Sequence, residues 1–173
     1  MIRVCLTGAE STGKSTLAPR LTERFGGVVV PEYGRLYAEH HGTDFTPEDL
    51  RRIAAGHIAA RRQAEKGGPR LIVEDTDIVL TCAWAEMLFG APDPELEAIP
   101  ASADLYLLFS PDVSWVDDGT RLFGSDERRA WFHRLIVDGL VRRGISAVSI
   151  AGDWERRYAD AVAAVAARLG DGR

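Results

Sequence analysis

The sequence predicts an α/β fold in which a five-stranded parallel sheet lies between two layers of helices, a three-layer αβα arrangement. Two observations support this fold. Five short apolar segments alternate along the chain with longer segments of helical periodicity. Polar residues suited to chemistry follow directly after apolar segments, and in a parallel sheet such positions gather at one edge. A chain of 173 residues supports one substantial core, so we expect a single domain over residues 1–173.

The expected strands are short runs of apolar, often β-branched residues. They span residues 2–7, 27–30, 70–75, 104–109 and 146–150. The fourth run is almost entirely apolar, as expected for a strand that helices cover on both faces. Strands that are connected through helices in this way pair in parallel, with right-handed crossovers.

The expected helices carry apolar residues at helical spacing. They span residues 14–25, 47–66, 77–89, 126–143 and 154–169. Thr46 can cap the second helix, which has Pro47 in its first turn. Pro19 falls inside the first helix and is expected to kink it. The proline-rich stretch 92–101 holds only a short helical piece.

A glycine-rich segment between the first strand and the first helix matches the phosphate-binding pattern G-x-x-x-x-G-K-[ST] in full. Its sequence, with one further residue, is Gly8-Ala9-Glu10-Ser11-Thr12-Gly13-Lys14-Ser15-Thr16. The glycines let the backbone aim several N–H groups at one phosphate, and the helix that follows adds its positive N-terminal end. Lys14 should reach the β- and γ-phosphates, and the Ser15 hydroxyl should ligate magnesium. The segment therefore predicts a P-loop NTPase fold that binds ATP and Mg²⁺.

Acidic residues follow the second and third expected strands. Asp75 ends its strand in the manner of a Walker B carboxylate, which holds the metal directly or through water. Asp77 cannot easily serve the same ion, so we expect it to hydrogen-bond a substrate hydroxyl. Glu32 follows the second strand, and either Glu32 or Asp75 is the candidate general base for an attacking hydroxyl. The alternative for Glu32 is an ordinary surface turn.

A loop beyond the fourth strand combines an aromatic residue, glycines and arginines. Trp115 and Asp118 come first, followed by Arg121 and, at the start of the next helix, Arg129. We expect a lid at about residues 115–130, in which Arg121 and Arg129 stabilise charge on the γ-phosphate and help to exclude water. The alternative is that these arginines are solvated on a helix surface.

Composition argues against several classes of protein. A net charge of −5 with scattered arginines gives no basic field for nucleic acid. No segment approaches the roughly 20 apolar residues of a membrane span, and no signal peptide is evident, so we expect a cytoplasmic protein. Cys5 and Cys82 show no metal or disulfide pattern and are expected in the core. His40, His41 and His57 are expected to be surface or capping residues. The oligomeric state cannot be predicted.

These motifs, in this order, resemble the ribosylnicotinamide kinase domain of the NadR type over nearly the whole chain. The resemblance rests on four groups of residues: Gly8 to Thr16, Glu32-Tyr33-Gly34-Arg35 with Tyr37, Asp75-Thr76-Asp77, and Trp115 to Ser125 with Arg129. It implies a fold like that of nucleoside and nucleotide kinases. It also implies ATP as donor and phosphorylation of nicotinamide riboside to nicotinamide mononucleotide.

The same resemblance implies positions for the ligands. Tyr33 and Trp115 are expected beside the pyridine ring, and the remaining acceptor-site residues are Glu32, Arg35, Tyr37, Asp77 and Asp118. Gly152-Asp153-Trp154 resembles the adenine-side loop of the family. Because no adenylyltransferase signature and no DNA-binding helix-turn-helix precede the kinase motifs, we expect neither of those activities.

Two other functions stay open at this point. The first is a deoxynucleoside or thymidylate kinase. Such kinases usually have an arginine after the acid that ends the third strand, where this chain has Thr76. The second is a nucleotide-binding regulatory module without a phosphoryl acceptor, against which the acidic and aromatic residues expected opposite the P-loop argue.

Overall fold

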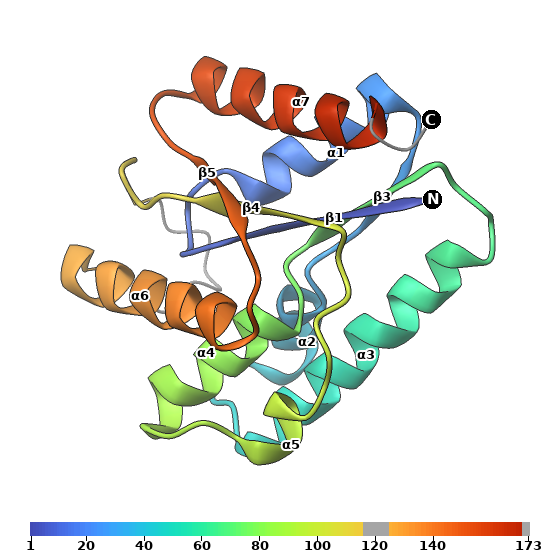
Figure 1. Cartoon of the computed structure of the whole chain (residues 1–173). Coiled ribbons are helices and arrows are strands. Elements are labelled where there is room, and N and C mark those ends of the chain that lie inside the picture. The colour runs from blue at the N-terminus through green and yellow to red at the C-terminus, as the bar shows by residue number, and fades with distance from the viewer. Residues whose placement is uncertain (116–124, 171–173) are drawn as a thin grey trace.

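The five strands form one sheet in the order β2-β3-β1-β4-β5, and every neighbouring pair is parallel (Figure 1). The computed structural model describes residues 1–115 and 125–170. The strands are β1 (Ile2–Gly8), β2 (Val28–Val30), β3 (Leu71–Asp75), β4 (Leu105–Phe109) and β5 (Ala147–Ile150). The predicted five-stranded parallel sheet is confirmed.

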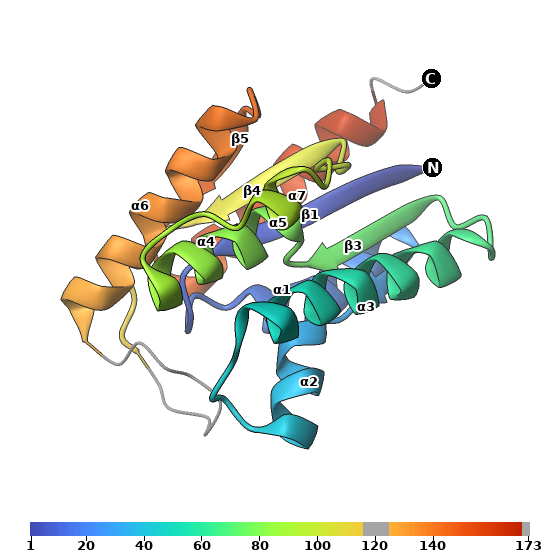
Figure 2. The same ribbon diagram turned by 90° about the horizontal axis from the view of Figure 1, so that it is seen from below.

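Helices cover both faces of the sheet. They are α1 (Lys14–Phe25), α2 (Tyr33–His41), α3 (Pro47–Glu65), α4 (Ile78–Phe89), α5 (Pro94–Glu97), α6 (Asp126–Arg142) and α7 (Trp154–Gly170). Helices α1 and α7 lie on one face, and α3, α4 and α6 lie on the other (Figure 1). Seen from below, α3 and α4 lie in front of the sheet and α7 lies behind it (Figure 2). The three-layer arrangement is therefore the predicted one.

The central strand β1 divides the core between the two helical layers. Val4 and Leu6 point to one side, where they pack with the buried residues of α1 and α7. Cys5 points to the other side and packs with α4 and α6, as the two-residue period of a strand requires. Cys5 and Cys82 are both buried and free, in agreement with their expected place in the core. Among the described helices, none is both long and apolar enough to cross a bilayer.

The strand register brings the ends of the inner strands together. Leu6 pairs with Asp75 of β3, and Gly8 pairs with Phe109 of β4. Because all strands run in the same direction, the segments that follow β1, β2, β3 and β4 emerge at one edge of the sheet. The glycine-rich segment, Glu32 and Asp75 therefore meet there.

Helix α2 was not predicted from the sequence. It begins directly after Glu32, and Ala38 is its one buried residue. With one glycine and few apolar residues, the segment has a weak helical pattern of its own. Contact with α3 compensates for this weak pattern. The Tyr33 ring packs directly on Gly56 of α3, in the space that a larger side chain at position 56 would fill. Tertiary packing thus stabilises a helix that local sequence does not indicate.

Three further expectations concern α3 and α1. Thr46 forms the predicted N-cap of α3, and its side chain accepts a hydrogen bond from the Asp49 N–H at 3.3 Å. Helix α1 continues through Pro19 to Phe25. His57 was expected at the surface or at a helix end, and that expectation is wrong. It is buried in the middle of α3, where its Nε2 lies 2.9 Å from Glu74 Oε2.

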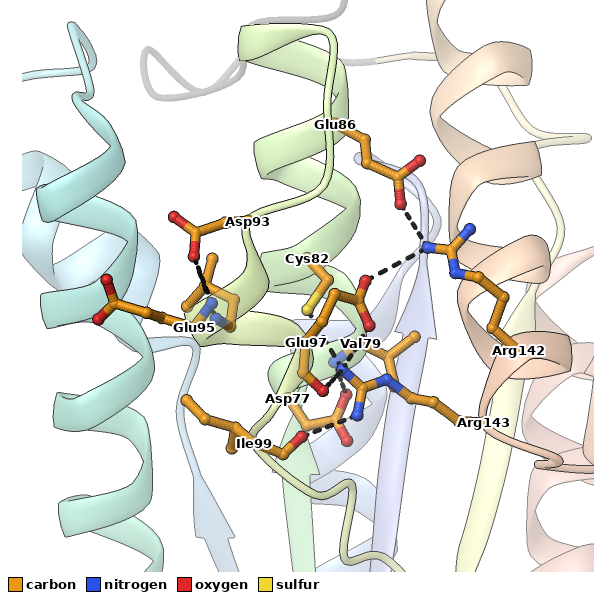
Figure 3. A network of polar contacts seen from close by, with 11 residues as sticks. Asp77, Val79, Cys82, Glu86, Asp93, Glu95, Glu97, Ile99, Arg142 and Arg143 are labelled. Carbon is orange, nitrogen blue, oxygen red and sulfur yellow. Dashed lines mark hydrogen bonds and ion pairs between the residues drawn. The ribbon is translucent and has the colours of Figure 1, made fainter.

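The C-terminal end of α6 is fastened to α4 and α5 by two arginines (Figure 3). Arg143 lies 3.0 Å from the Glu97 carboxylate and donates to the Ile99 carbonyl at 2.7 Å. Arg142 pairs with Glu86 of α4 and with Glu97 of α5. These contacts fix α6 against α4, and both helices contribute side chains to the pocket described below.

Candidate active site

The glycine-rich segment forms a tight loop between β1 and α1. Gly8, Ser11 and Gly13 have φ values of 141°, 60° and 90°, which place all three in the positive-φ region. A Cβ atom on Gly8 would lie 2.5 Å from the Phe109 carbonyl oxygen of the neighbouring strand. Glycine at position 8 is therefore required by the close approach of β4.

Lys14 is held at this loop. Its Nζ donates to the carbonyl oxygens of Gly8 and Ala9, both at 2.8 Å, and the side chain is buried. The Thr12 hydroxyl also donates to the Ala9 carbonyl, at 2.9 Å. A positive charge and the N-terminal end of α1 thus converge on the segment that the sequence predicts to bind phosphate.

The loop forms one end of a pocket of about 940 Å³, including open space at its mouth. Glu32, Arg35, Thr76 and Thr81 add polar groups to the wall. The other end of the wall is apolar and aromatic, and consists of Ala38, Phe45, Leu50, Ile53, Leu80, Trp84 and Phe132. One end therefore suits phosphate groups, and the other suits a flat ring.

Glu32 is largely buried between β2 and α2, with a side chain that is 23% exposed. Its carboxylate lies 3.8 Å from the Arg35 guanidinium. Burial raises the pKa of Glu32 to about 7, and the nearby charge of Asp75 acts in the same direction. The positive charges of Lys14 and Arg35 oppose this rise in pKa. A carboxyl group with such a pKa can exchange a proton near neutral pH, as a general base must.

Asp75 ends β3 and is 3% exposed. Its Oδ1 is buried and has no hydrogen-bond partner among the described residues. A buried carboxylate oxygen without a donor is costly unless a cation or an ordered water satisfies it. The next residue, Thr76, has the strained φ of 74° and lines the pocket. Asp75 and the pocket-lining Ser15 therefore fit a magnesium ion.

That ion would need further ligands from outside the protein. Within residues 1–115 and 125–170, no group of three or more His, Cys, Asp or Glu residues is arranged to hold a metal. Magnesium commonly binds through one or two protein groups together with phosphate oxygens and water. The arrangement is consistent with an ion that arrives with a nucleotide.

Asp77 is engaged within the protein. It caps α4 by accepting from the Val79 N–H at 2.9 Å, and it accepts from the Tyr106 hydroxyl at 2.5 Å. Burial raises the pKa of Asp77. Asp77 is absent from the described wall of the main pocket. Its expected contact with a substrate hydroxyl stays a prediction.

The aromatic residues expected beside the acceptor are absent from the described wall of the pocket, and their contact with the acceptor stays a prediction. Tyr33 packs on Gly56, and the Tyr37 hydroxyl donates to Asp49 at 2.6 Å. Neither ring belongs to the described wall of the pocket, and the same holds for Trp115, whose indole nitrogen is buried without a described partner. Asp118 and Arg121 fall outside the described residues, so their expected roles remain predictions.

Arg129 reaches the phosphate-binding loop from α6. Its guanidinium donates to the Val113 carbonyl at 3.0 Å and to the Glu10 carbonyl at 3.4 Å. The residue is 2% exposed, which excludes the alternative of an arginine solvated on the helix surface. The loop Gly152-Asp153-Trp154 also contacts the phosphate-binding loop, with the Trp154 ring packed on Gly13.

The match to a known family extends over nearly the whole fold. A family model described as an AAA domain matches residues 3–157. The chain belongs to this AAA-domain family. It is 33% identical over 98% of its length to the trifunctional NAD biosynthesis/regulator protein NadR of Escherichia coli (strain K12). The chain spans 43% of that relative, which is less than half of its length. The predicted resemblance to a NadR-type P-loop domain is confirmed.

Solved structures place the AAA-domain chain among nucleoside kinase folds. A NadR protein in complex with NR superposes with a TM-score of 0.80 at 24% identity, over 98% of this chain and 50% of that protein. Deoxyadenosine kinase from M. mycoides superposes with a TM-score of 0.63 at 12% identity, over 98% of this chain and all of that enzyme. At these identities the likeness shows the fold alone.

Three aromatic pocket residues of this AAA domain were missed from the sequence. Trp84 lies at the centre of an aromatic row, with ring centroids 5.2 Å from Phe132 and 6.3 Å from Phe45. A signal existed for Trp84, because its helix is apolar around the whole circumference and must therefore be covered on more than one side. Phe45 stands in a connecting segment and Phe132 on an ordinary amphipathic helix, so neither could be distinguished from a core residue.

Proposed function

We propose that the chain is an ATP-dependent kinase that phosphorylates nicotinamide riboside to nicotinamide mononucleotide. The observation that carries this proposal is one continuous pocket. It joins a complete P-loop, a carboxyl group with a pKa of about 7, and an aromatic wall. The similarity to NadR supports the choice of acceptor.

The donor side of the pocket follows from the P-loop. Its backbone N–H groups, the Lys14 ammonium and the N-terminal end of α1 bind the triphosphate. Ser15 and Asp75 would hold magnesium, which neutralises charge on the β- and γ-phosphates when it is bound. Lys14 then exchanges its bonds to the Gly8 and Ala9 carbonyls for bonds to phosphate oxygens.

Glu32 is the general base in this proposal. It accepts the proton of the acceptor hydroxyl, whose oxygen forms a bond to the γ-phosphorus while the bond from that phosphorus to the β-phosphate oxygen breaks. The products are the phosphorylated acceptor and ADP. Asp75 is less suited to accept the proton, because a carboxylate that holds magnesium is a weak base.

The acceptor side follows from the aromatic wall. The pyridinium ring of nicotinamide riboside carries a fixed positive charge, which aromatic faces and a carboxylate attract. Trp84, Phe132 and Phe45 supply the faces, and Glu32 supplies the negative charge. Stacking and cation–π attraction together contribute on the order of 2 kcal/mol to such a complex.

A deoxynucleoside kinase is the second candidate, because the aromatic wall of the pocket also suits a neutral nucleobase. One experiment separates the candidates. ADP release from MgATP is measured with nicotinamide riboside, thymidine, deoxycytidine and no acceptor. We expect release that depends on nicotinamide riboside. Faster ADP release with thymidine or deoxycytidine supports the second candidate. ADP release at the same rate with and without each acceptor supports a regulatory module.

A further inference from the structure

Arg157 is a buried arginine for which the proposed reaction has assigned no role. It extends from the first turn of α7 and is 1% exposed. A guanidinium has five N–H donors in a rigid planar fork, and here each donor has an acceptor. Nε donates to the Gly152 carbonyl at 2.7 Å, Nη1 to those of Thr12 and Ile150 at 3.4 and 3.5 Å, and Nη2 to the Ser110 carbonyl at 3.1 Å and the Asp112 carboxylate.

The acceptors come from three separate segments of the chain. Thr12 belongs to the phosphate-binding loop, Ser110 follows β4, and Gly152 follows β5. Thr12 and Arg157 are 145 positions apart in the sequence. One side chain therefore joins the phosphate-binding loop to the two loops beside it, at the edge of the sheet where the pocket lies. Lysine, with three donors on one atom, cannot make the same set of contacts.

Asp112 also holds the loop that contains Gly152. One carboxylate oxygen pairs with Arg157, and the other accepts from the Gly152 N–H at 2.7 Å. Gly152 has a φ of 89°, which glycine adopts more easily than any other residue. The Asp112 side chain is 42% exposed, and an ion pair with a partner open to solvent adds little stability. The number and direction of these contacts instead define the position of the loop.

The loop held in this way carries Trp154. One edge of its ring lies 2.6 Å from the point that a Cβ atom on Gly13 would occupy, so the indole rests on the phosphate-binding loop. The Arg157 guanidinium lies 5.7 Å from the ring centroid. Trp154 is nevertheless 54% exposed. An aromatic face thus stands open to solvent directly beside the phosphate-binding loop.

We propose that Arg157, together with Asp112, is a positioning residue for the phosphate donor. It fixes the distance between the phosphate-binding loop and the Trp154 loop, so that the base and the triphosphate of one nucleotide bind at the same time. The inference rests on the proposed ATP-dependent function. Arg157 itself touches neither the transferred phosphate nor the acceptor.

The test compares Arg157→Lys with Arg156→Lys in the full chain. Arg156 precedes Arg157, is 73% exposed and pairs with Asp160, so it is a matched control. We expect Arg157→Lys to weaken binding of Mg-AMP-PNP, measured by calorimetry, by about tenfold, or about 1.4 kcal/mol. The KM for the acceptor should stay within about twofold of the parent value. Arg156→Lys should change neither quantity.

Inorganic tripolyphosphate supplies the decisive arm, because it occupies the phosphate-binding loop without a base. The affinity for tripolyphosphate should fall by less than about threefold in Arg157→Lys. The lost contacts set the distance between two loops, and this distance matters only for a ligand that reaches both of them. Equal losses for tripolyphosphate and AMP-PNP, or unchanged AMP-PNP binding with a lower melting temperature, would overturn the proposal.

A second variant keeps the proposal testable if Arg157→Lys does not fold. Asp112→Asn keeps one oxygen for Arg157 and loses the second acceptor, so AMP-PNP affinity should fall by about threefold, again more than that of tripolyphosphate. Unchanged AMP-PNP affinity in this variant would contradict the inference. AMP-PNP binding needs no acceptor, so these measurements hold even if nicotinamide riboside is not phosphorylated.

Discussion

Replacing Glu32 with glutamine tests the assignment of the general base. The change keeps the shape of the side chain and removes its ability to accept a proton. General base catalysis contributes about 10²- to 10⁴-fold, so we expect kcat to fall by at least about a hundredfold. The affinity for Mg-AMP-PNP should change by less than about threefold, because Glu32 faces the acceptor hydroxyl in the proposed reaction.

The same substitution, which should lower kcat, is predicted to raise the stability of the folded protein above neutral pH. The pKa of Glu32 rises from 4.5 to about 7 on folding, so the folded protein binds this proton more tightly than the unfolded chain does. The stabilisation by protonation is complete below about pH 4.5 and is lost as the pH rises through 7. At about 1.4 kcal/mol per pH unit, the loss approaches about 3 kcal/mol. Glu32→Gln should therefore melt at a higher temperature than the parent protein at pH 8.

Two measurements test these predictions. The first is kcat/KM as a function of pH, and the second is the melting temperature at pH 5 and pH 8, determined by calorimetry. For the parent protein, kcat/KM should rise tenfold per pH unit below the pKa and level off above about pH 8. Glu39→Gln, at an exposed position on α2, is the control and should behave as the parent does. A variant with near-parental kcat, or one that is not stabilised at pH 8, would refute the roles given to Glu32.

Three further substitutions address the donor, the acceptor and the lid. Lys14→Ala should reduce turnover to less than about a tenth of the parent value while the protein stays folded, as judged by circular dichroism. Trp84→Leu should raise the KM for nicotinamide riboside by tens-fold, about 2 kcal/mol, with an unchanged KM for ATP, whereas Trp131→Leu on the outer surface of α6 should have no effect. Arg129→Ala should lower kcat by about one to three orders of magnitude with a smaller loss of ATP affinity, and Arg128→Ala is its control. If a variant and its control changed the kinetic constants equally, the residue would have only a structural role.

The sheet and the phosphate-binding loop could be predicted because their signals are local. Strand β4 is apolar through its whole length, and Gly8 and Gly13, which have positive φ in the loop, belong to one contiguous sequence pattern. The direction of the strands then determines that Glu32 and Asp75 meet the loop. No contact between distant residues had to be known for these conclusions.

The remaining features depend on partners that are distant in the sequence. Helix α2 is stabilised because Tyr33 packs on α3. His57 can be buried because its Nε2 forms a hydrogen bond with the Glu74 carboxylate of β3. Arg157 was not singled out from the sequence, because its acceptors lie in three other segments. Sequence alone could not identify Phe45 and Phe132 as pocket residues, because core and pocket walls use the same apolar side chains.

The most direct test of the account is product analysis by ³¹P NMR after the purified chain is mixed with MgATP and nicotinamide riboside. The account predicts that ADP and nicotinamide mononucleotide form in equal amounts, and that both form at less than about a tenth of the parent rate when Lys14 is replaced by alanine. Formation of ADP without nicotinamide mononucleotide, or a faster reaction with thymidine in the same tube, would contradict it.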